Sequence, residues 1–447
     1  MTGRNEAERA LHDISTADRA NSKSVAESSR VLCALPWIGL HNQSNGDVFP
    51  CCNWTGETLG TLRQSSLPRI MNAEPMKRLR RDMLAGKPNA GCSSCHDNER
   101  LGLFSLRGWA NENFGANSAL LKSTRGDGSL AEPRFRYLHL NFSNLCNLRC
   151  RTCSPRRSTA WYQDVAILMR ERYGDVPKQI PLTPTQDPAD FLRALEPHLT
   201  GLHTIQLAGG EPLLAKEHHE LLERLVDLKL THVRLLYNTN LSVLRYRNKD
   251  LTRLWSRFEN VEFWVSFDAS GRRGEYLRKG QRWNEAVANW RRLRRACPLA
   301  RMNLAPVISL FNAAHIPDFH REWIEAGLIR PDDFHLHVLR APRPYSIQAY
   351  PASMKERLLE RFERHLSYLG ALTPRPDAVA KVFRGVMKFM TAADLGGELE
   401  NFRKTTSELD RVRGEKLLDV FPELSELFPS PSASSARSPR RNPPNGS

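Results

Sequence analysis

Long apolar runs are missing from this chain of 447 residues. No stretch approaches the roughly 18 consecutive apolar residues that a membrane span needs, and the start, MTGRNEAERALHDIS, lacks the apolar core of a secretory signal. An internal repeat is absent as well. With 40% hydrophobic and 26% charged residues, the composition is that of a globular protein. We therefore expect a cytoplasmic protein with no membrane partner.

Cysteines are scarce beyond the first third of the chain. Eight of the nine lie in roughly that third, and Cys297 is the exception. Because the cytoplasm keeps thiols reduced, disulfides are a poor explanation for this clustering. The distribution predicts metal sites. Cys297 lies late in an amphipathic stretch and is expected to be a buried or idle thiol.

Positive charge is in excess, with a formal net charge of +16 and a pI of about 9.7. Such a balance suits an anionic partner: a nucleic acid, a phosphorylated metabolite or an acidic peptide. The arginines are interleaved with glutamates in helical stretches such as RLLERFERH, which is typical of solvated helix faces. Charge alone therefore identifies no partner.

Composition divides the chain into six segments. The two ends lack apolar periodicity and are expected to be disordered, and the cysteine-rich segment has too few core formers to fold easily without a metal. The segments are a disordered N-terminus (1–30), a small cysteine-rich domain (31–100), a linker (101–132), a core domain (133–345), a helical C-terminal extension (346–428) and a disordered tail (429–447).

The core domain alternates short apolar runs with amphipathic stretches. The expected strands are FRYLHLNF, LHTIQLAG, VRLLYNTN, VEFWVSFD, LAPVISLF and FHLHVLRA, and helical stretches such as HHELLERLVDLK lie between them. About six alternations predict an α/β fold with a parallel sheet, either an open doubly wound sheet or a partial (β/α) barrel. Both place reactive groups where strands end and loops begin.

Three cysteines follow the first expected strand of the core. CNLRCRTC places Cys146, Cys150 and Cys153 in the spacing C-x3-C-x2-C. Three thiolates on one tight loop can bind three irons of a 4Fe-4S cubane and leave the fourth open to a small molecule. A zinc site is the alternative, although zinc normally takes a second close pair of cysteines or histidines, and no fourth ligand follows nearby.

This spacing, in this place, resembles the radical S-adenosylmethionine (SAM) superfamily over about 133–345. The resemblance implies a partial (β/α)6 barrel in which the open iron binds the amino and carboxylate groups of SAM. One electron from the cluster then cleaves a C–S bond, and the 5′-deoxyadenosyl radical that results abstracts hydrogen from a substrate. The family often carries an aromatic residue just before the third cysteine, where this chain has Thr152.

LAGGEP follows the second expected strand of the core and contains Gly209, Gly210, Glu211 and Pro212. It resembles the family's Gly-Gly-Glu-Pro motif, whose backbone and glutamate contact the methionyl ammonium. Physically, glycines let the backbone approach a ligand, and a carboxylate offsets a positive charge. An ordinary strand-to-helix turn is the alternative.

Polar residues at later strand ends complete the cofactor pocket that the resemblance implies. Such positions also favour Asn, Asp and Ser as turn and cap residues. The candidates are Asn238, Asn240, Ser266, Asp268 and, after the fifth strand, Asn312.

A second cysteine group precedes the core. Cys33, Gly46 and Cys51 form C-x12-G-x4-C, and CSSC adds Cys92 and Cys95. The pattern resembles the SPASM and twitch auxiliary-cluster domains of the same superfamily. The shorter twitch type fits better, since the later cysteines of the SPASM pattern are missing. Four thiolates would then ligate a second 4Fe-4S cluster. Cys52 could replace Cys51, and a four-cysteine zinc site has the same spacing.

The resulting hypothesis is a radical SAM enzyme with an N-terminal auxiliary-cluster domain, an unusual order for this superfamily. The expected cofactors are two 4Fe-4S clusters and SAM, and the expected electron donor is a reduced flavodoxin- or ferredoxin-like protein. The substrate stays open between a peptide and a small molecule, and the excess of positive charge would suit an anionic one. An RNA-modifying radical SAM enzyme and a zinc-containing nucleic-acid-binding protein are the two rival hypotheses.

Overall fold

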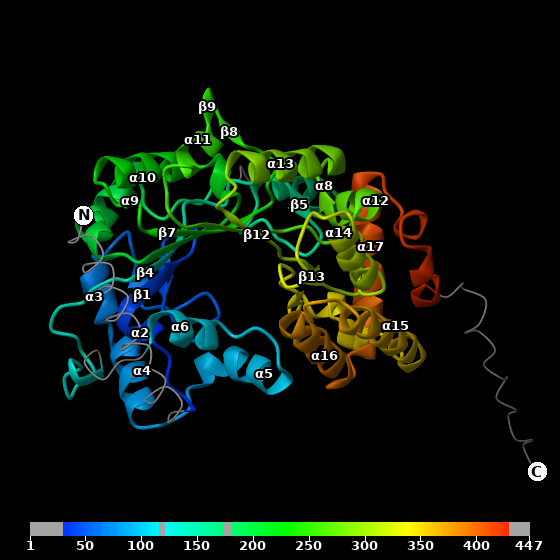
Figure 1. Ribbon diagram of the computed structural model, residues 1–447, viewed down its shortest axis with the longest axis horizontal. Helices are drawn as coiled ribbons and strands as arrows, with labels where there is room; N and C mark the ends of the chain where they lie inside the picture. The colour runs from blue at the N-terminus through cyan, green and yellow to red at the C-terminus, as the bar shows by residue number, and fades with distance from the viewer. Residues whose placement is uncertain (1–29, 116–120, 174–179, 429–447) are drawn as a thin grey trace, which may run out of the picture.

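The computed structural model describes residues 30–115, 121–173 and 180–428 (Figure 1). The disorder expected for 1–30 and 429–447 falls outside these residues, apart from Arg30. In the described part of the chain, no helix combines the length and apolarity that a membrane crossing requires.

One eight-stranded sheet organises the molecule, in the order β12-β10-β7-β6-β4-β1-β2-β3. Neighbours from β12 to β1 run parallel, and β2 and β3 add antiparallel strands at one end. The strands are β1 (Gly39–Asn42), β2 (Asp47–Phe49), β3 (Gly60–Thr61), β4 (Tyr137–Asn141), β6 (Thr204–Ala208), β7 (Arg234–Thr239), β10 (Val261–Val265) and β12 (Arg301–Leu304). The sheet does not close, as expected for a partial barrel.

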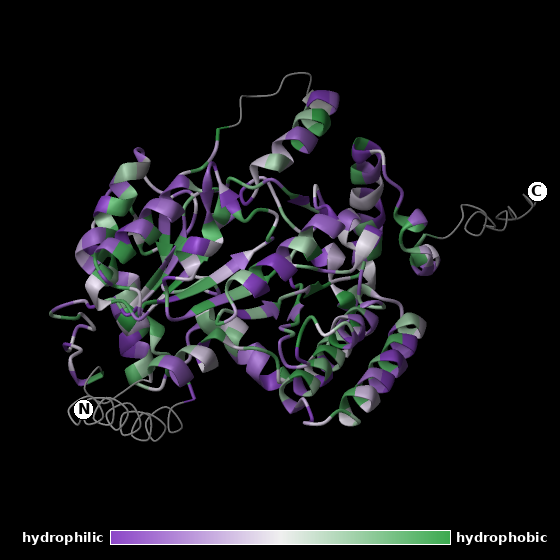
Figure 2. Ribbon diagram, turned by 45° about the horizontal axis from the view of Figure 1, so that its top comes forward, coloured by the Kyte–Doolittle hydropathy of each residue, from purple (hydrophilic) through white to green (hydrophobic). Residues whose placement is uncertain are grey.

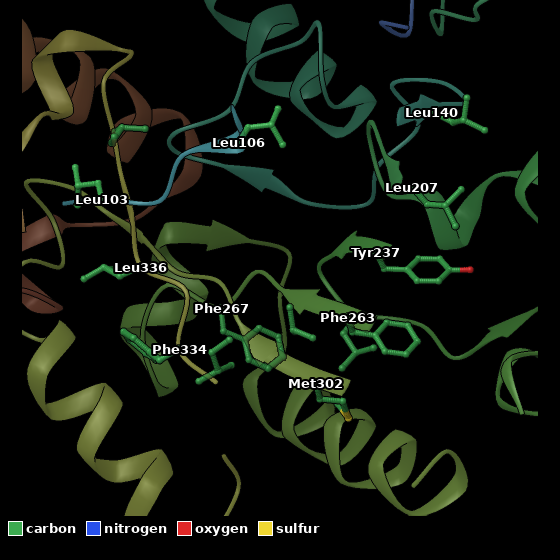
Figure 3. Packing of buried hydrophobic residues seen from close by; sticks show 14 of the residues in the cluster. Leu103, Leu106, Leu140, Leu207, Tyr237, Phe263, Phe267, Met302, Phe334 and Leu336 are labelled. Atoms are coloured by element: carbon green, nitrogen blue, oxygen red, sulfur yellow. The ribbon is translucent and has the colours of Figure 1, made fainter. Parts of the chain in front are cut away.

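The central strands are buried on both faces, which is typical of parallel strands covered on each side. Every residue of β4 and of β10 is buried. Tyr237 on β7 and Phe263 on β10 are register neighbours, and their rings stack 5.0 Å apart (Figure 3). This apolar packing fixes the register and therefore the position of each strand end.

Amphipathic helices cover one face of the sheet: α9 (Pro188–Leu195), α10 (Lys216–Asp227), α11 (Leu251–Trp255) and α13 (Trp283–Ala296) (Figure 1). In α13, the side chains of Ala286, Trp290 and Leu293 recur at helical spacing and are buried. Figure 2 shows hydrophilic and hydrophobic residues alternating along the helical ribbons. The burial of one stripe therefore holds each crossover helix against the strands.

The cysteine-rich segment is joined to the core sheet rather than set apart from it. Its strand β1 pairs in parallel with β4, with His41 opposite His139. Its helices lie on the side of the sheet opposite α10 and α13 (Figure 1). They are α2 (Leu35–Ile38), α3 (Leu67–Met71), α4 (Glu74–Leu84) and α5 (Ser93–Leu101), with a 3-10 turn at Ala90–Cys92.

The segment 101–132, expected to be a linker, contains the helix α6 (Leu106–Phe114). Its Trp109 ring lies edge-on to Tyr137 of β4, with 5.7 Å between ring centroids. Ser105 caps the helix by accepting a hydrogen bond from the Gly108 amide at 3.1 Å. This segment therefore packs against the inner face of the sheet.

The sixth expected strand does not join the main sheet. Beyond Leu304, the last residue of β12, the described ranges 305–311 and 334–341 form only β13 (Val307–Ile308) and β14 (His337–Val338), which pair with each other. A single bridge from Leu304 to Phe334 connects this pair toward β12. Pro306 lacks an N–H group and cannot donate to a neighbouring strand, although its carbonyl accepts from the His337 amide at 3.0 Å.

The C-terminal extension is helical, as expected, and lies beside the open edge of the barrel (Figure 1). Its helices are α15 (Ala352–Gly370), α16 (Asp377–Thr391) and α17 (Leu399–Arg413). The remaining elements are α8 (Tyr162–Tyr173), α12 (Gly271–Leu277), α14 (Ile316–Glu325), β5 (Arg149–Cys150), β8 (Arg245–Tyr246), β9 (Lys249–Asp250), β11 (Arg278–Lys279) and several 3-10 turns.

Candidate functional site

The cysteine triplet lies in the loop that follows β4, at the carboxyl edge of the sheet. Burial raises the pKa of Cys146 to about 11 and of Cys150 to about 12, and Cys153 raises both further. The three thiols therefore lie close together. The thiols therefore stay protonated when no metal is bound. A bound metal cation would favour the thiolate form instead, since metal binding releases the thiol protons.

The backbone of this loop is held from both sides. The Cys153 amide donates to the Cys150 carbonyl at 3.0 Å, and β5 pairs with β11, so that Cys150 lies opposite Arg278. Arg278 Nη1 lies 3.8 Å from Cys150 Sγ, and its guanidinium forms a 2.8 Å ion pair with Asp268. A buried cation is thus positioned beside a thiol, which suits an anionic cluster.

The residues fit a multi-iron cluster by donor type and grouping: three cysteines, none in a disulfide, on one loop. In the described ranges, no three His, Cys, Asp or Glu side chains are placed to hold one metal ion. A single zinc ion would bring its sulfurs to roughly 3.8 Å from one another, given Zn–S bonds of about 2.3 Å. A cubane distributes its thiolates over separate irons.

The Gly-Gly-Glu-Pro turn packs directly against the triplet loop. The Gly210 amide donates to Ser143 O at 2.9 Å, and the Glu211 amide donates to Leu145 O at 2.7 Å. A Cβ at Gly210 would lie 2.2 Å from Leu145 O, and Gly209 has a φ of +113°. Only glycine permits this approach, so the two sequence motifs form one structural unit.

Glu211 is buried and accepts three hydrogen bonds. They come from Thr239 Oγ1 at 2.7 Å, the Asn240 amide at 2.7 Å and the Leu213 amide at 3.2 Å. Burial nevertheless raises its pKa to about 7. The carboxylate therefore lacks a cationic partner strong enough to offset desolvation, as expected if a ligand cation binds there. Pro212 follows it and is buried.

Asn238 and Asn240 lie beside these motifs at the end of β7. Asn240 Nδ2 is 3.8 Å from Cys146 Sγ and donates to Asn147 Oδ1 at 3.1 Å. Asn238 Oδ1 accepts from Gln206 Nε2 at 2.6 Å. Asn240 thus lies beside the triplet, whereas Asn238 lines the neighbouring cavity, and contact of either residue with SAM stays a prediction.

The candidates at the later strand ends are engaged within the protein. Asn312 is fully buried, and its Nδ2 donates to Asp268 O at 2.9 Å and Val307 O at 3.0 Å. Asp268 accepts from the Val307 amide at 2.9 Å in addition to its ion pair. The Ser266 amide donates to Thr239 O at 2.8 Å. For Asn312, a direct cofactor contact would break existing hydrogen bonds.

The thiols of the second cysteine group also lie close together. Burial raises the pKa of Cys33 to about 12, and Cys95 and Cys92 add to that shift. Burial likewise raises the pKa of Cys51 well above its ordinary value, with further contributions from Cys52, Cys33 and Cys95. Burial raises the pKa of Cys52 as well, but Cys95 is the only other thiol that contributes. Cys33, Cys51, Cys92 and Cys95 thus form the closer set.

Gly46, the glycine of that cysteine pattern, forms the turn between β1 and β2 with a φ of +94°. A Cβ there would lie 2.3 Å from Pro184 O. The glycine of the pattern therefore has a steric reason in this chain: a side chain at this turn would collide with the backbone of Pro184.

A cavity of about 490 Å³ lies between the two cysteine groups and is lined by Cys52, Gly209 and Asn238, among others. A larger cavity of about 1090 Å³ lies near the starts of the strands, where Arg234 pairs with Glu262. We place the candidate active site in the smaller cavity, because it adjoins both motifs at the carboxyl ends of the strands.

Sequence reasoning missed most of the polar residues that line this cavity. His41, His139, Asn141 and Arg157 belong to it. A signal was present: in β4, His139 and Asn141 alternate with leucines in a strand that is otherwise apolar. A polar side chain at every second position of a buried strand indicates a wet interior face.

Buried ion pairs join the triplet loop to the C-terminal extension. Arg151 is fully buried, lies 3.6 Å over the Tyr276 ring and pairs with Glu415 at 2.7 Å and with Asp410. Asp164 of α8 accepts from Arg413 of α17 at 2.8 Å. The extension therefore fixes the position of the cysteine loop.

The Asp164→Ala variant is expected to lower the free energy of unfolding by about 3–5 kcal/mol, since it leaves Arg413 buried without its partner. Chemical denaturation of the purified holoprotein measures this. Glu171→Ala is the matched control: it removes an exposed pair between the same helices, Glu171 with Arg411, worth at most about 1 kcal/mol. An equal loss of unfolding free energy in both variants would contradict the stabilising role of the buried ion pair.

Two family models match the chain. Residues 140–321 match the radical SAM superfamily, and residues 33–96 match the SPASM iron-sulfur cluster-binding domain. No curated protein matches.

The solved structures that match the chain include native anSMEcpe with bound AdoMet and Kp18Cys peptide, at 16% identity over 52% of this chain and 59% of that chain, with a TM-score of 0.36. Another is Streptococcus suis SuiB bound to precursor peptide SuiA, at 16% identity over 53% of this chain and 47% of that chain, with a TM-score of 0.34. The matched region thus spans about half to three fifths of each of those chains.

Proposed function

The chain carries a radical SAM domain preceded by an iron-sulfur cluster-binding domain, and from this premise we propose that it cleaves SAM reductively and abstracts hydrogen from a substrate held in the 490 Å³ cavity. These domains confirm the family that the cysteine motifs resemble, in the unusual order expected. They also confirm 4Fe-4S clusters and SAM as the cofactors. The reaction on the substrate is part of the proposal.

One observation supports the proposal most strongly: the Gly-Gly-Glu-Pro turn and the triplet loop are built into each other, with the Glu211 amide 2.7 Å from Leu145 O. A ligand bound to an open iron would thus meet Glu211 and the end of β7 at once. Cys146, Cys150 and Cys153 would hold the cluster, which when bound supplies the electron that breaks a C–S bond of SAM.

In the proposed reaction, the protein's own residues bind SAM and orient it. Glu211 is placed to accept hydrogen bonds from the methionyl ammonium, because burial outweighs the distant charge of Arg278 and no ion pair to its carboxylate forms within the described residues. Asn240 adds an amide within 3.8 Å of Cys146 Sγ. The cysteine group around Cys33 and Cys95 would hold a second cluster near the far wall of the cavity, and a reduced flavodoxin- or ferredoxin-like protein is the proposed donor.

The test is an anaerobic incubation of the reconstituted protein with SAM and dithionite, with 5′-deoxyadenosine and methionine measured by liquid chromatography. We expect both products, and we expect neither without dithionite. A protein that is loaded with iron and sulfide but gives no 5′-deoxyadenosine would contradict the proposal.

The Glu211→Gln variant is expected to weaken SAM binding by about tenfold or more, since one charge-assisted hydrogen bond is replaced by a neutral one. Equilibrium dialysis with labelled SAM on the oxidised holoprotein measures this. Glu220→Gln, on the exposed face of α10 where Glu220 pairs with Lys216, is the control and should bind SAM as the wild type does.

SAM affinity is also expected to depend on pH through Glu211. Its pKa is raised to about 7 by burial, so the carboxyl gains a proton as the pH falls below about 7 and then no longer attracts an ammonium group. Dialysis at several pH values between 6 and 8.5 should show weaker binding at the acidic end, in the wild type but not in Glu211→Gln. A pH dependence that is the same in both proteins would contradict the assignment.

A further inference from the structure

The 490 Å³ cavity has an unusual set of charges. Two arginines, Arg157 and Arg340, are among the described residues that line it, and no Asp or Glu is. Arg340 donates from Nη2 to Asn98 Oδ1 at 2.6 Å and lies over the Phe389 ring. In the described ranges, neither arginine forms an ion pair with a carboxylate, although ion pairs are common elsewhere in this chain. The cavity therefore offers two cations without protein counterions.

Buried polar groups without partners line the same cavity. His41 and His139, register neighbours on β1 and β4, are each 5% exposed, and their rings meet edge-on with 4.3 Å between centroids. Within the described residues, Nδ1 of both rings and Oδ1 of Asn141 have no hydrogen-bond partner. Buried polar atoms normally have one. These atoms mark a built polar wall rather than a packing surface.

Both histidines are neutral near pH 7. Burial and the charge of Arg157 lower the pKa of His41 to about 3, and burial, His41 and Arg157 lower that of His139 well below its ordinary value. A neutral imidazole offers one donor and one acceptor. The positive charge of the cavity thus comes from the two arginines, and the histidines supply hydrogen bonds without charge.

Aromatic side chains form the opposite wall. Phe104, Trp109 and Trp264 line both this cavity and the larger one, so they separate the two. The Phe104 ring is edge-on to Trp264 at 5.5 Å. Leu103 and Leu336, labelled in Figure 3, add apolar surface to the same cavity. A ring-sized apolar group would find contacts here that a fully polar ligand would not.

We propose that the substrate bound in this cavity is an organic acid, a carboxylate or a phosphate ester, with its anionic group on Arg157 and Arg340 and an apolar, ring-sized body against Trp264 and Phe104. The inference rests on the proposed function, because it names the substrate class of the same site. Arginine suits both anions, since its guanidinium presents paired donors to two oxygens. Gly209 lines the cavity, so the substrate would lie next to the SAM-binding turn.

The experiment is equilibrium dialysis of the anaerobic holoprotein with saturating SAM and no reductant, against four ligands of one size. Phenyl phosphate and phenylacetate are the anions, benzyl alcohol is neutral and benzylamine is cationic. We expect the anions to bind and the other two to bind at least about tenfold more weakly. Phenyl phosphate as the tighter anion would identify a phosphate ester, and phenylacetate would identify a carboxylate.

Arg157→Gln and Arg340→Gln should each weaken binding of the preferred anion by about tenfold. Arg156→Gln is the matched control, because Arg156 is exposed beside Arg157 in sequence and does not line the cavity. All three variants should keep their iron.

Three results would overturn the inference. The first is that neither anion binds, or that benzyl alcohol or benzylamine binds as tightly. The second is an equal loss of binding in Arg156→Gln. The third comes from repeating the dialysis without SAM: anions that bind only when SAM is left out would make the arginines part of the SAM site. Formation of 5′-deoxyadenosine without substrate tests the proposed function separately, so the two failures are distinguishable.

Discussion

The Cys150→Ala variant is expected to form no 5′-deoxyadenosine and to keep about half of the wild-type iron, roughly four atoms of eight. Cys150 lies at the centre of the triplet: its pKa responds to both Cys153 and Cys146, and Arg278 Nη1 lies 3.8 Å from its sulfur. Losing one of only three protein ligands leaves the cubane with two, whereas the other cysteine group is unchanged.

Iron and sulfide analysis after anaerobic purification, together with the 5′-deoxyadenosine assay, measures both effects. Cys297→Ala is the control, because Cys297 is buried away from both groups, with its thiol 3.4 Å from Thr252 O. That variant should keep full iron content and activity. If Cys150→Ala still cleaved SAM, the triplet would not be the reactive site.

Alanine substitution of the adjacent cysteines Cys51 and Cys52 is expected to have opposite effects on the second cluster. Cys51→Ala should lose the second cluster, about four irons, because Cys51 is coupled to Cys33 and Cys95 within the closer set of thiols. Cys52→Ala should keep it, because Cys52 receives a pKa contribution from one thiol of the closer set, Cys95, and its side chain lines the cavity. Neither change touches the triplet, so both variants should still form 5′-deoxyadenosine without substrate.

The iron content and the Mössbauer spectrum of the two variants, prepared in parallel, decide between these positions. Each variant serves as the control for the other, since the same side chain is removed one residue away. Loss of the cluster in Cys52→Ala and its retention in Cys51→Ala would reverse the assignment. Loss in neither would mean that either thiol can complete the site.

The local features of this protein could be predicted from its sequence, because their causes are local. The spacing of Cys146, Cys150 and Cys153 and the Gly209–Gly210 pair after β6 are each determined within one loop. The structure supplies the steric reason that joins them: a Cβ at Gly210 would meet Leu145 O at 2.2 Å. Alternation of apolar runs and amphipathic stretches likewise predicted the parallel sheet and its crossover helices.

The features that sequence missed depend on distant pairing. Strand β1 joins the main sheet beside β4, almost one hundred residues later, with Leu40 opposite Leu138. No local pattern determines such a partner. The same pairing brings His41 to His139 and so creates the polar wall of the cavity. The fifth expected strand, 304–311, was misplaced because its apolar run gave no weight to Pro306, whereas the strand of the main sheet, β12, covers Arg301–Leu304.

The most direct test of the central claim is the electron paramagnetic resonance spectrum of the dithionite-reduced protein before and after SAM is added. We predict two cluster signals, of which one changes when SAM is added, because only the triplet leaves an iron without a protein ligand. That change should persist in Cys51→Ala and vanish in Cys150→Ala. Zinc in place of iron, or two signals that both ignore SAM, would contradict it.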